Sequence, residues 1–356
     1  MAGEEANKRQ AMEIGIYTLG DLCPSPFTGE RISARQRLAE ILRTAKMADE
    51  AGLDVFGVGE HHRLDYCVSS PAVLLAAISQ VTRWITLTSA TTVLNTVDPV
   101  RLFEEFSTLD LLSEGRAEIL AGRGAFLEPF ELFGYDQSHY DQLFEENLDL
   151  LLNLTAHEKV TWEGVFRSSL NEAEISPRPY QKKLPVWVGV GSSRASAARA
   201  GRYGVNLAVA MLGGYPSDFK PLIDTYREAA KQTGHDLDAL KVGVTGHAYI
   251  AKTSEQAREE YYPYHLNYWE TVNAQQGGPR YVVSRKEFDQ LTEPETSLFV
   301  GSSEQVVEKI LRQHEMFGHQ RFMAQLDIGG LPFKKVAECI ERLATEVAPA
   351  VRKATR

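Results

Sequence analysis

The sequence predicts an α/β protein built as a (β/α)8 TIM barrel with insertion segments, and three observations lead to this fold class. Short β-branched runs alternate with longer amphipathic helical stretches along the 356 residues, giving eight strand–helix units. The strand segments are apolar throughout, which is typical of parallel strands buried on both faces. Eight units fit a closed barrel better than an open doubly wound sheet, and no G-x-G-x-x-G follows the first strand to favour a dinucleotide-binding sheet. We expect a single barrel domain over residues 1–356.

The first half of the chain supplies four of the expected strands. Ser33 and Gln36 form a capping box at the start of the first helix, and Gly52 stands where that helix needs a left-handed residue. Asp98 followed by Pro99 predicts the start of the third helix, over 99–113. The strands are expected at 12–19, 53–60, 85–94 and 117–121, with further helices near 71–82 and 140–154.

The second half of the chain continues the alternation of strands and helices, with two interruptions. Residues 159–180 are polar and predict a hairpin, and residues 260–297, rich in tyrosine, glycine and proline, predict an insertion that folds over the site as a lid or packs on the barrel rim. The remaining strands are expected at 185–190, 205–212, 241–251 and 321–327, with helices at 193–203, 217–233, 303–317 and 334–347.

Composition narrows the class of protein. The 38 basic and 48 acidic residues give a net charge of −10, which argues against nucleic acid as a partner. No run of about 18 apolar residues exists, so we expect no membrane span. The N-terminus lacks the apolar stretch of a secretion signal, and the three widely spaced cysteines indicate reduced thiols in a cytoplasmic protein.

Candidate catalytic residues follow the second strand, because barrel enzymes carry their sites at the carboxyl ends of strands. Glu60, His61 and His62 stand there, and alternation along an extended segment lets at most one of the two histidines face the barrel axis. The competing interpretation is that both histidines are bonded within the structure. A metal site is not expected, since no His-Glu-x-x-His or Cys-x-x-Cys spacing is present.

Two further strand ends predict a phosphate site. Arg123 stands between Gly122 and Gly124, which let a ligand approach the backbone. Gly191-Ser192-Ser193 opens a helix that also carries Ser196, and the N–H groups and dipole of a helix start suit a phosphate. The alternatives are a surface salt bridge for the arginine and simple N-caps for the serines.

These segments together resemble the bacterial luciferase-like family of flavin-dependent monooxygenases. The resemblance covers nearly the whole chain. It is carried by GLDVFGVGEHH (52–62), TSATTVLNTVDPVRLFEEFSTLDLLSEGR (88–116), AEILAGRGAFLEPFELFGYD (117–136) and VWVGVGSSRASAARAGRYG (186–204).

The resemblance implies a (β/α)8 barrel that binds reduced FMN and uses O2 to oxidise a small organic substrate. It places His61 beside the flavin as a general acid or base, and it implies a non-prolyl cis peptide at Ala90–Thr91 that belongs to the cofactor site. The residues that it places around the flavin phosphate are Arg123, Gly191, Ser192, Ser193 and Ser196.

The partners expected from the resemblance are a separate flavin reductase and a second copy of the chain. A homodimer through the helix at 99–113 also fits the apolar residues Leu102, Phe103, Phe106 and Leu109. Two alternatives to an FMN-dependent monooxygenase stay open at this point. One is a deazaflavin-dependent dehydrogenase on the same barrel, and the other is a flavin-binding protein without turnover.

Overall fold

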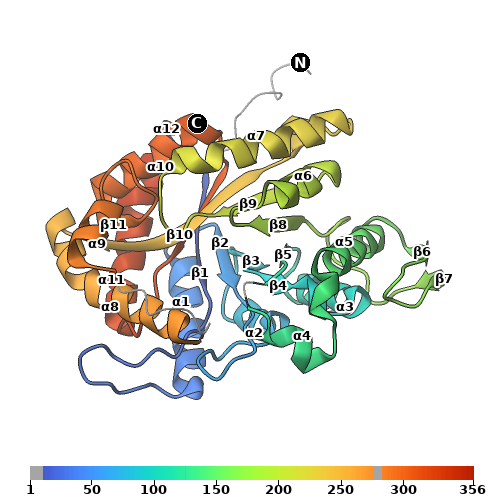
Figure 1. The fold of residues 1–356 in the computed structure, drawn as a ribbon, viewed down its shortest axis with the longest axis horizontal. Helices are drawn as coiled ribbons and strands as arrows, with labels where there is room; N and C mark the ends of the chain where they lie inside the picture. The colour runs from blue at the N-terminus through green and yellow to red at the C-terminus, as the bar shows by residue number, and fades with distance from the viewer. Residues whose placement is uncertain (1–10, 125, 276–282) are drawn as a thin grey trace.

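The computed structural model describes residues 11–124, 126–275 and 283–356, and within them the expected barrel is present (Figure 1). Eight parallel strands close into a ring, because β1 pairs with β2 on one side and with β12 on the other. Its strands in order around the ring are β1 (Glu13–Thr18), β2 (Val55–Val58), β3 (Thr86–Ser89), β5 (Ala117–Gly122), β8 (Val186–Val190), β9 (Asn206–Ala210), β10 (Val242–Ala251) and β12 (Arg321–Gln325).

Helices surround this ring, and their ends follow the signals in the sequence. Ser33 accepts a hydrogen bond from the Gln36 N–H at the start of α1, but the Gln36 side chain donates to Glu40, so the expected capping box is only half formed. Asp98 accepts from Val100 and Arg101 at the start of α3. Gly52 adopts the left-handed conformation that was expected of it, with φ of 78°. The helices are α1 (Ala34–Glu50), α2 (Pro71–Ser79), α3 (Pro99–Leu112), α4 (Glu128–Phe133), α5 (Tyr140–Ala156), α6 (Arg194–Arg202), α7 (Pro216–Gln232), α8 (Ser254–Gln275), α9 (Arg285–Leu291), α10 (Ser303–Phe317), α11 (Phe333–Arg342) and α12 (Ala348–Ala354). No helix in the described part of the chain is long and apolar enough to cross a membrane.

The expected strand at 85–94 is divided in the structure. The Ala90–Thr91 peptide is cis, and it separates β3 from the short strand β4 (Thr92–Val93). The change of direction cannot be read from the β-branched residues on either side, because they favour extended backbone throughout.

The segment predicted as an insertion, 260–297, contains most of α8, which already begins at Ser254, and all of α9. Residues 276–282 of that prediction lie outside the described residues. β10 runs on past the barrel, where its residues 248–251 pair with β11 (Phe299–Ser302), a strand that the sequence analysis did not predict. Figure 1 shows this extension reaching the side of the molecule where α8 and α9 lie, while the expected hairpin, β6 (Lys159–Trp162) with β7 (Leu170–Glu174), projects at the other side.

The apolar face of α3 packs inward. Leu102, Phe103, Phe106 and Leu109 are each at most 2% exposed, so they belong to the core of one protomer. The reason given for a dimer from these four residues was therefore wrong. A barrel helix buries such a stripe against its own sheet, and amphipathic spacing cannot distinguish that surface from a subunit interface.

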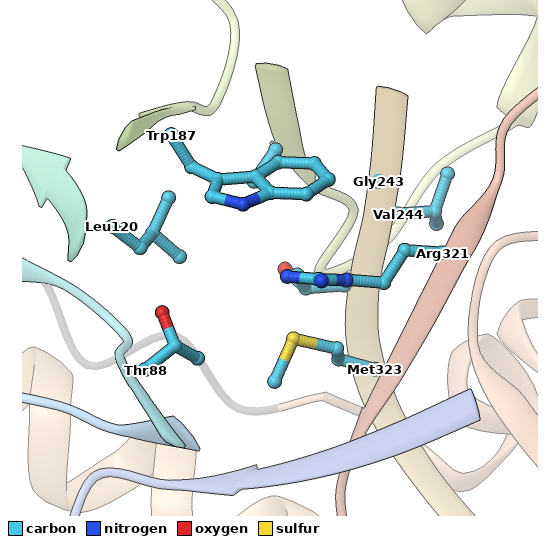
Figure 2. Close-up of a pocket in the computed structure, with 9 residues that line it drawn as sticks. Thr88, Leu120, Trp187, Gly243, Val244, Arg321 and Met323 are labelled. Carbon is cyan, nitrogen blue, oxygen red and sulfur yellow. The ribbon is translucent and has the colours of Figure 1, made fainter. Parts of the chain in front are cut away.

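The amino-terminal end of the barrel interior is closed by an ion-paired arginine. Figure 2 shows the Arg321 side chain extending between the Trp187 ring and the Met323 side chain, beside a cavity of about 10 Å³. Its Nε donates to Glu13 at 2.7 Å and its Nη1 to Glu118 at 2.6 Å, and the guanidinium carbon lies 4.2 Å from the centre of the Trp187 ring system. The charged side chains around Arg321 thus have partners, and the larger cavity of the barrel lies toward the other end.

Candidate active site

A cavity of about 650 Å³ occupies the carboxyl end of the barrel. This volume falls in the range of cofactor and small-molecule sites. Its walls come from the ends of all eight barrel strands and from helices that contribute Tyr140 of α5, Phe219 of α7 and Tyr268 of α8. The cavity lies where barrel enzymes place their chemistry.

The structure brings nearly all the predicted site residues to this one cavity. Its lining includes His61, Ala90, Thr91, Arg123, Gly191, Ser192 and Ser193. Ser196 is absent from the lining: it lies within the first turn of α6, 3% exposed, where its hydroxyl bonds the Ser193 Oγ at 3.1 Å. Ser196 therefore positions Ser193, and a direct contact with a bound phosphate is not indicated.

His61 faces the cavity from the loop after β2. Its backbone N–H donates to Val68, and its ring packs 4.0 Å from the Tyr66 ring and 5.1 Å from the Phe126 ring. The ring Nε2 is buried and has no hydrogen-bond partner among the described residues. Burial lowers the pKa of His61 to about 4, so the imidazole is neutral at pH 7, and the unperturbed pKa assumed from the sequence does not hold.

His62 points to a different environment, as strand alternation predicted for one of the two histidines. Its Nε2 bonds a Glu60 oxygen at 2.7 Å, and its ring packs on Phe133. The other Glu60 oxygen accepts from the Val93 N–H at 2.9 Å. Glu60 and His62 therefore brace the loop around β4, and His61 is the histidine that stays available.

Four glycines at strand ends fit closely around the Ala90–Thr91 peptide. A Cβ on Gly57 would lie 2.9 Å from the Ala90 Cβ, and one on Gly59 would lie 2.9 Å from the Ala90 carbonyl oxygen. On the opposite side, a Cβ on Gly122 would approach the Thr91 Oγ1 to 2.4 Å, and one on Gly189 would meet the Thr91 methyl at 2.9 Å. The sequence thus keeps glycines at the end of β2 on one side of β3, and on β5 and β8 on the other side, so that this peptide can border the cavity.

The ends of β5 and β8 form the cationic part of the cavity. Arg123 is the sole cation among the described lining residues; its Nη1 pairs with Asp141 at 2.6 Å, and its guanidinium lies 5.0 Å from the Tyr140 ring centre. Across from it, Ser193 caps α6, whose first-turn N–H groups have no partners within the helix. A Cβ on Gly191 would meet nothing within 4 Å, so the backbone there is open to a ligand.

Among the lining residues that the sequence did not predict are Tyr17, His247, Gln325 and Tyr268. The first three stand on β1, β10 and β12, and the strand register places Gln325 beside both Tyr17 and His247. A usable signal was present, because each is a polar residue within a strand that is buried along nearly its whole length. The candidates taken from the sequence came from the ends of the second to fifth strands, and the first, seventh and eighth strands were not considered in the same way.

Sequence comparisons identify relatives along most of the chain. The flavin-dependent trigonelline monooxygenase oxygenase component of Acinetobacter baylyi is 23% identical over 345 residues, covering 90% of this chain and 93% of that protein. N-acetyl-S-alkylcysteine monooxygenase of Bacillus subtilis is 25% identical over 306 residues, covering 80% of this chain and 85% of the relative.

Structural comparisons find the same barrel in solved proteins. A monooxygenase from Streptomyces bottropensis superimposes with a TM-score of 0.81 at 24% identity, covering 95% of this chain and 99% of the other. The oxygenating constituent of 3,6-diketocamphane monooxygenase from Pseudomonas putida, solved with FMN, gives 0.76 at 21% identity, covering 95% and 98%. A secondary alcohol dehydrogenase that depends on coenzyme F420 gives 0.73 at 17% identity, covering 96% and 99%.

The decisive comparison is with models of protein families. The model of luciferase-like monooxygenases matches residues 12–320, which include every strand of the barrel up to β10 and each of the predicted site residues. This chain belongs to the luciferase-like monooxygenase family.

Proposed function

We propose that the protein is the oxygenase component of a two-component system, which takes reduced FMN from a separate reductase and uses O2 to oxygenate a small organic substrate. The observation that carries this proposal is the convergence of Arg123, the start of α6 and the unpaired His61 on one cavity. The relative from Acinetobacter, an oxygenase component by name, and the FMN-bound neighbour support the choice of cofactor and the separate reductase.

The residues of the cavity fit a flavin mononucleotide. Its phosphate would be held by the Arg123 guanidinium, the Ser192 and Ser193 hydroxyls and the N–H groups at the start of α6. Arg123 is the single cation in the described lining, which suits one phosphate better than the longer acidic tail of a deazaflavin cofactor. Ala90 and Thr91, which line the same cavity, would border the flavin ring.

When bound and reduced, the flavin supplies the electrons that activate O2. The chain supplies the surroundings. Leu19, Val93, Leu120, Ala208 and Met323 give the cavity an apolar wall that excludes water. His61, neutral at pH 7, donates a hydrogen bond from one ring nitrogen and accepts at the other, and it can take up a proton released in the reaction.

The test of the cofactor assignment is an Arg123→Ala variant titrated with FMN and with riboflavin, which lacks the phosphate. Loss of a charge-assisted hydrogen bond costs about 1.5–3 kcal/mol, so FMN affinity should fall about ten- to a hundredfold while riboflavin affinity stays unchanged. Arg167→Ala is the matched control, since Arg167 is also ion-paired, to Asp98 at 2.8 Å, and is similarly exposed but lies outside the cavity lining. Unchanged FMN affinity in Arg123→Ala would remove the phosphate assignment.

We also propose that the protein acts as a homodimer in the cytoplasm. Large apolar side chains are exposed near the carboxyl ends of α2 and α3, where Trp84 is 80% exposed and Leu112 50% exposed. Cys23, Cys67 and Cys339 are free thiols, as expected of a reducing compartment. Light scattering should give twice the mass of the chain, and Trp84→Glu should weaken the dimer while Val165→Glu, on the far hairpin, should not. A wild-type monomer at micromolar concentration would exclude the dimer.

A further inference from the structure

The cavity has a second polar end that the proposed phosphate contacts leave unused. β12 lies between β1 and β10 in the ring, and in the strand register Gln325 is level with Tyr17 on one side and His247 on the other. These strands stand across the ring from β5 and β8, which carry Arg123 and Gly191. Tyr268 of α8 adds its side chain to the same end. We call these four residues, Tyr17, His247, Tyr268 and Gln325, the distal cluster.

The distal cluster contains buried polar atoms without a well-formed hydrogen bond. Both ring nitrogens of His247 and the amide nitrogen of Gln325 make no hydrogen bond of good geometry among the residues that the structure describes, although each side chain is 1% exposed. The Gln325 side chain lies close enough to His247 to raise the His247 pKa slightly against the effect of burial. A buried donor or acceptor left unpaired is costly, so such atoms are rare in folded proteins unless a water or a ligand meets them. Two neighbouring side chains with three such atoms, both lining one cavity, indicate a ligand.

The distal cluster carries no charge at neutral pH. Burial lowers the pKa of His247 to about 4, and the adjoining Gln325 amide offsets only part of that shift. Burial also raises the pKa of Tyr17 and Tyr268 above the ordinary value for a phenol. The charged residues of the described lining, Glu60 and Arg123, stand on other strands and already have partners.

We infer that the distal cluster is the substrate subsite, and that it receives an uncharged polar group, such as a carbonyl, amide or hydroxyl, rather than a carboxylate or an ammonium. This inference rests on the proposed function, because it assumes that the flavin phosphate occupies the opposite end. An amide or carbonyl oxygen can accept from the His247 ring or the Gln325 amide, and a hydroxyl or amide N–H can donate to the other His247 nitrogen. A charged group would lose its hydration there. The carboxylates of Asp21 and Asp327 contribute to the raised pKa values of the two tyrosines of the cluster. They lie outside the cavity lining and are paired with Arg37, so they do not offer a charged group a free countercharge.

The test compares three ligands of one shape on the FMN-loaded protein at pH 7.5: cyclohexanecarboxamide, cyclohexanecarboxylate and cyclohexylmethylammonium. Binding is measured by calorimetry and by the change in flavin absorbance. We expect the carboxamide to bind about ten- to a hundredfold more tightly than either charged probe. Equal affinity of the three probes, or no saturable binding of the carboxamide, would overturn the inference.

His247→Phe tests the residue itself, because it keeps a ring of similar shape and removes both nitrogens. His265→Phe is the matched control: His265 is 1% exposed with both ring nitrogens also unpaired within the described ranges, and its ring lies 6.2 Å from that of His247, but it does not line the cavity. We expect His247→Phe to lose at least tenfold in carboxamide affinity with FMN affinity within twofold of the wild type, and His265→Phe to retain both.

Gln325→Leu gives a second measurement if His247→Phe does not fold, and the same tenfold loss is expected. Unchanged carboxamide affinity in either folded variant overturns the inference and leaves the FMN assignment intact. Failure of the wild type to bind FMN overturns the proposed function, a result that the FMN titration shows before any probe is added.

Discussion

The two ends of the barrel interior differ in how their charged and imidazole side chains are partnered. At the amino-terminal end, Arg321 is bonded to Glu13 and Glu118 and stacked on Trp187, so its charge is fully partnered within the fold. At the carboxyl end, His61, His247 and Gln325 keep buried nitrogens that make no hydrogen bond of good geometry with the described residues. The same strands contribute to both ends, since β12 carries Arg321 at its first position and Gln325 at its last.

This difference distinguishes the residues that stabilise the fold from the residues that are available to bind a ligand. A buried polar group that is hydrogen-bonded by its neighbours contributes to the stability of the barrel. A buried polar group without a partner lowers that stability until a ligand binds to it. Substitutions at the amino-terminal end should therefore act on the free energy of unfolding, and substitutions at the carboxyl end should act on binding and rate.

The largest effect is expected for Arg321→Met. Burial alone would raise the pKa of Glu13, but Arg321 and Lys241 outweigh it and hold that pKa below its usual value. Removing the arginine leaves Glu118 and Glu13 less compensated, which should cost about 3–5 kcal/mol in urea denaturation. FMN affinity should stay within twofold. Arg312→Met, which removes exposed pairs to Glu295 and Glu308, should cost below about 1 kcal/mol. Equal losses in the two variants would contradict the comparison.

His61→Ala should have the opposite effect to Arg321→Met: turnover should fall and the stability of the fold should change little. General acid–base assistance is worth about 10²–10⁴ in rate, so turnover on a panel of organic substrates with reduced FMN and O2 should fall at least a hundredfold. The melting temperature should stay near that of the wild type and flavin binding should weaken modestly. His62→Ala is the matched control, because His62 itself lies outside the cavity lining and its loss removes a bond that braces Glu60, so it should affect melting more than rate. A fall in melting temperature with turnover preserved would return His61 to a purely structural role.

Acid should destabilise the protein through its buried histidines, of which His61 and His247 lie at the carboxyl end of the barrel and His265 and His319 lie outside the cavity lining. The folded-state pKa of His61 and of His247 is about 4, against about 6.5 for an unperturbed histidine, so the unfolded chain binds protons first as the pH falls. Stability is therefore fully present above about pH 6.5 and declines toward pH 4, by about 1.4 kcal/mol per pH unit for each such histidine. Urea denaturation at pH 7.5, 6.5 and 5.5 measures the slope, and His247→Phe should make it shallower. A slope identical to the wild type would show that His247 is protonated alike in both states.

The smallest effect is expected at the rim of the phosphate end. Asp141 is 62% exposed and binds Arg123 at 2.6 Å, so its carboxylate competes with a phosphate for the same cation. An exposed pair of this kind is worth about 0–1 kcal/mol, so Asp141→Asn should raise FMN affinity up to about fivefold and leave riboflavin affinity unchanged. Weaker FMN binding in this variant would mean that Asp141 orients Arg123 rather than competing for it.

The order of elements and much of the site could be predicted from the sequence because they depend on local patterns. Alternating apolar runs with caps such as Ser33 and Asp98 predicted the barrel, and two loop motifs predicted Arg123 and Ser193. Each motif lies within a few consecutive residues, so its chemistry is read without knowing what packs on it. A local pattern was also the reason for the wrong interpretation of α3 as a dimer interface, because its apolar residues pack inward against the barrel.

Only the tertiary structure decided which residues from distant parts of the chain come into contact, and how burial changes their pKa values. Tyr17, His247 and Gln325 are far apart in the chain, and the register of β1, β10 and β12 brings them to one level of the barrel. The pKa of His61 likewise depends on burial that no sequence pattern records. Local conformation follows from neighbouring residues, whereas desolvation and strand register arise only when the ring closes, and these two effects give the carboxyl end its unpaired, uncharged polar atoms.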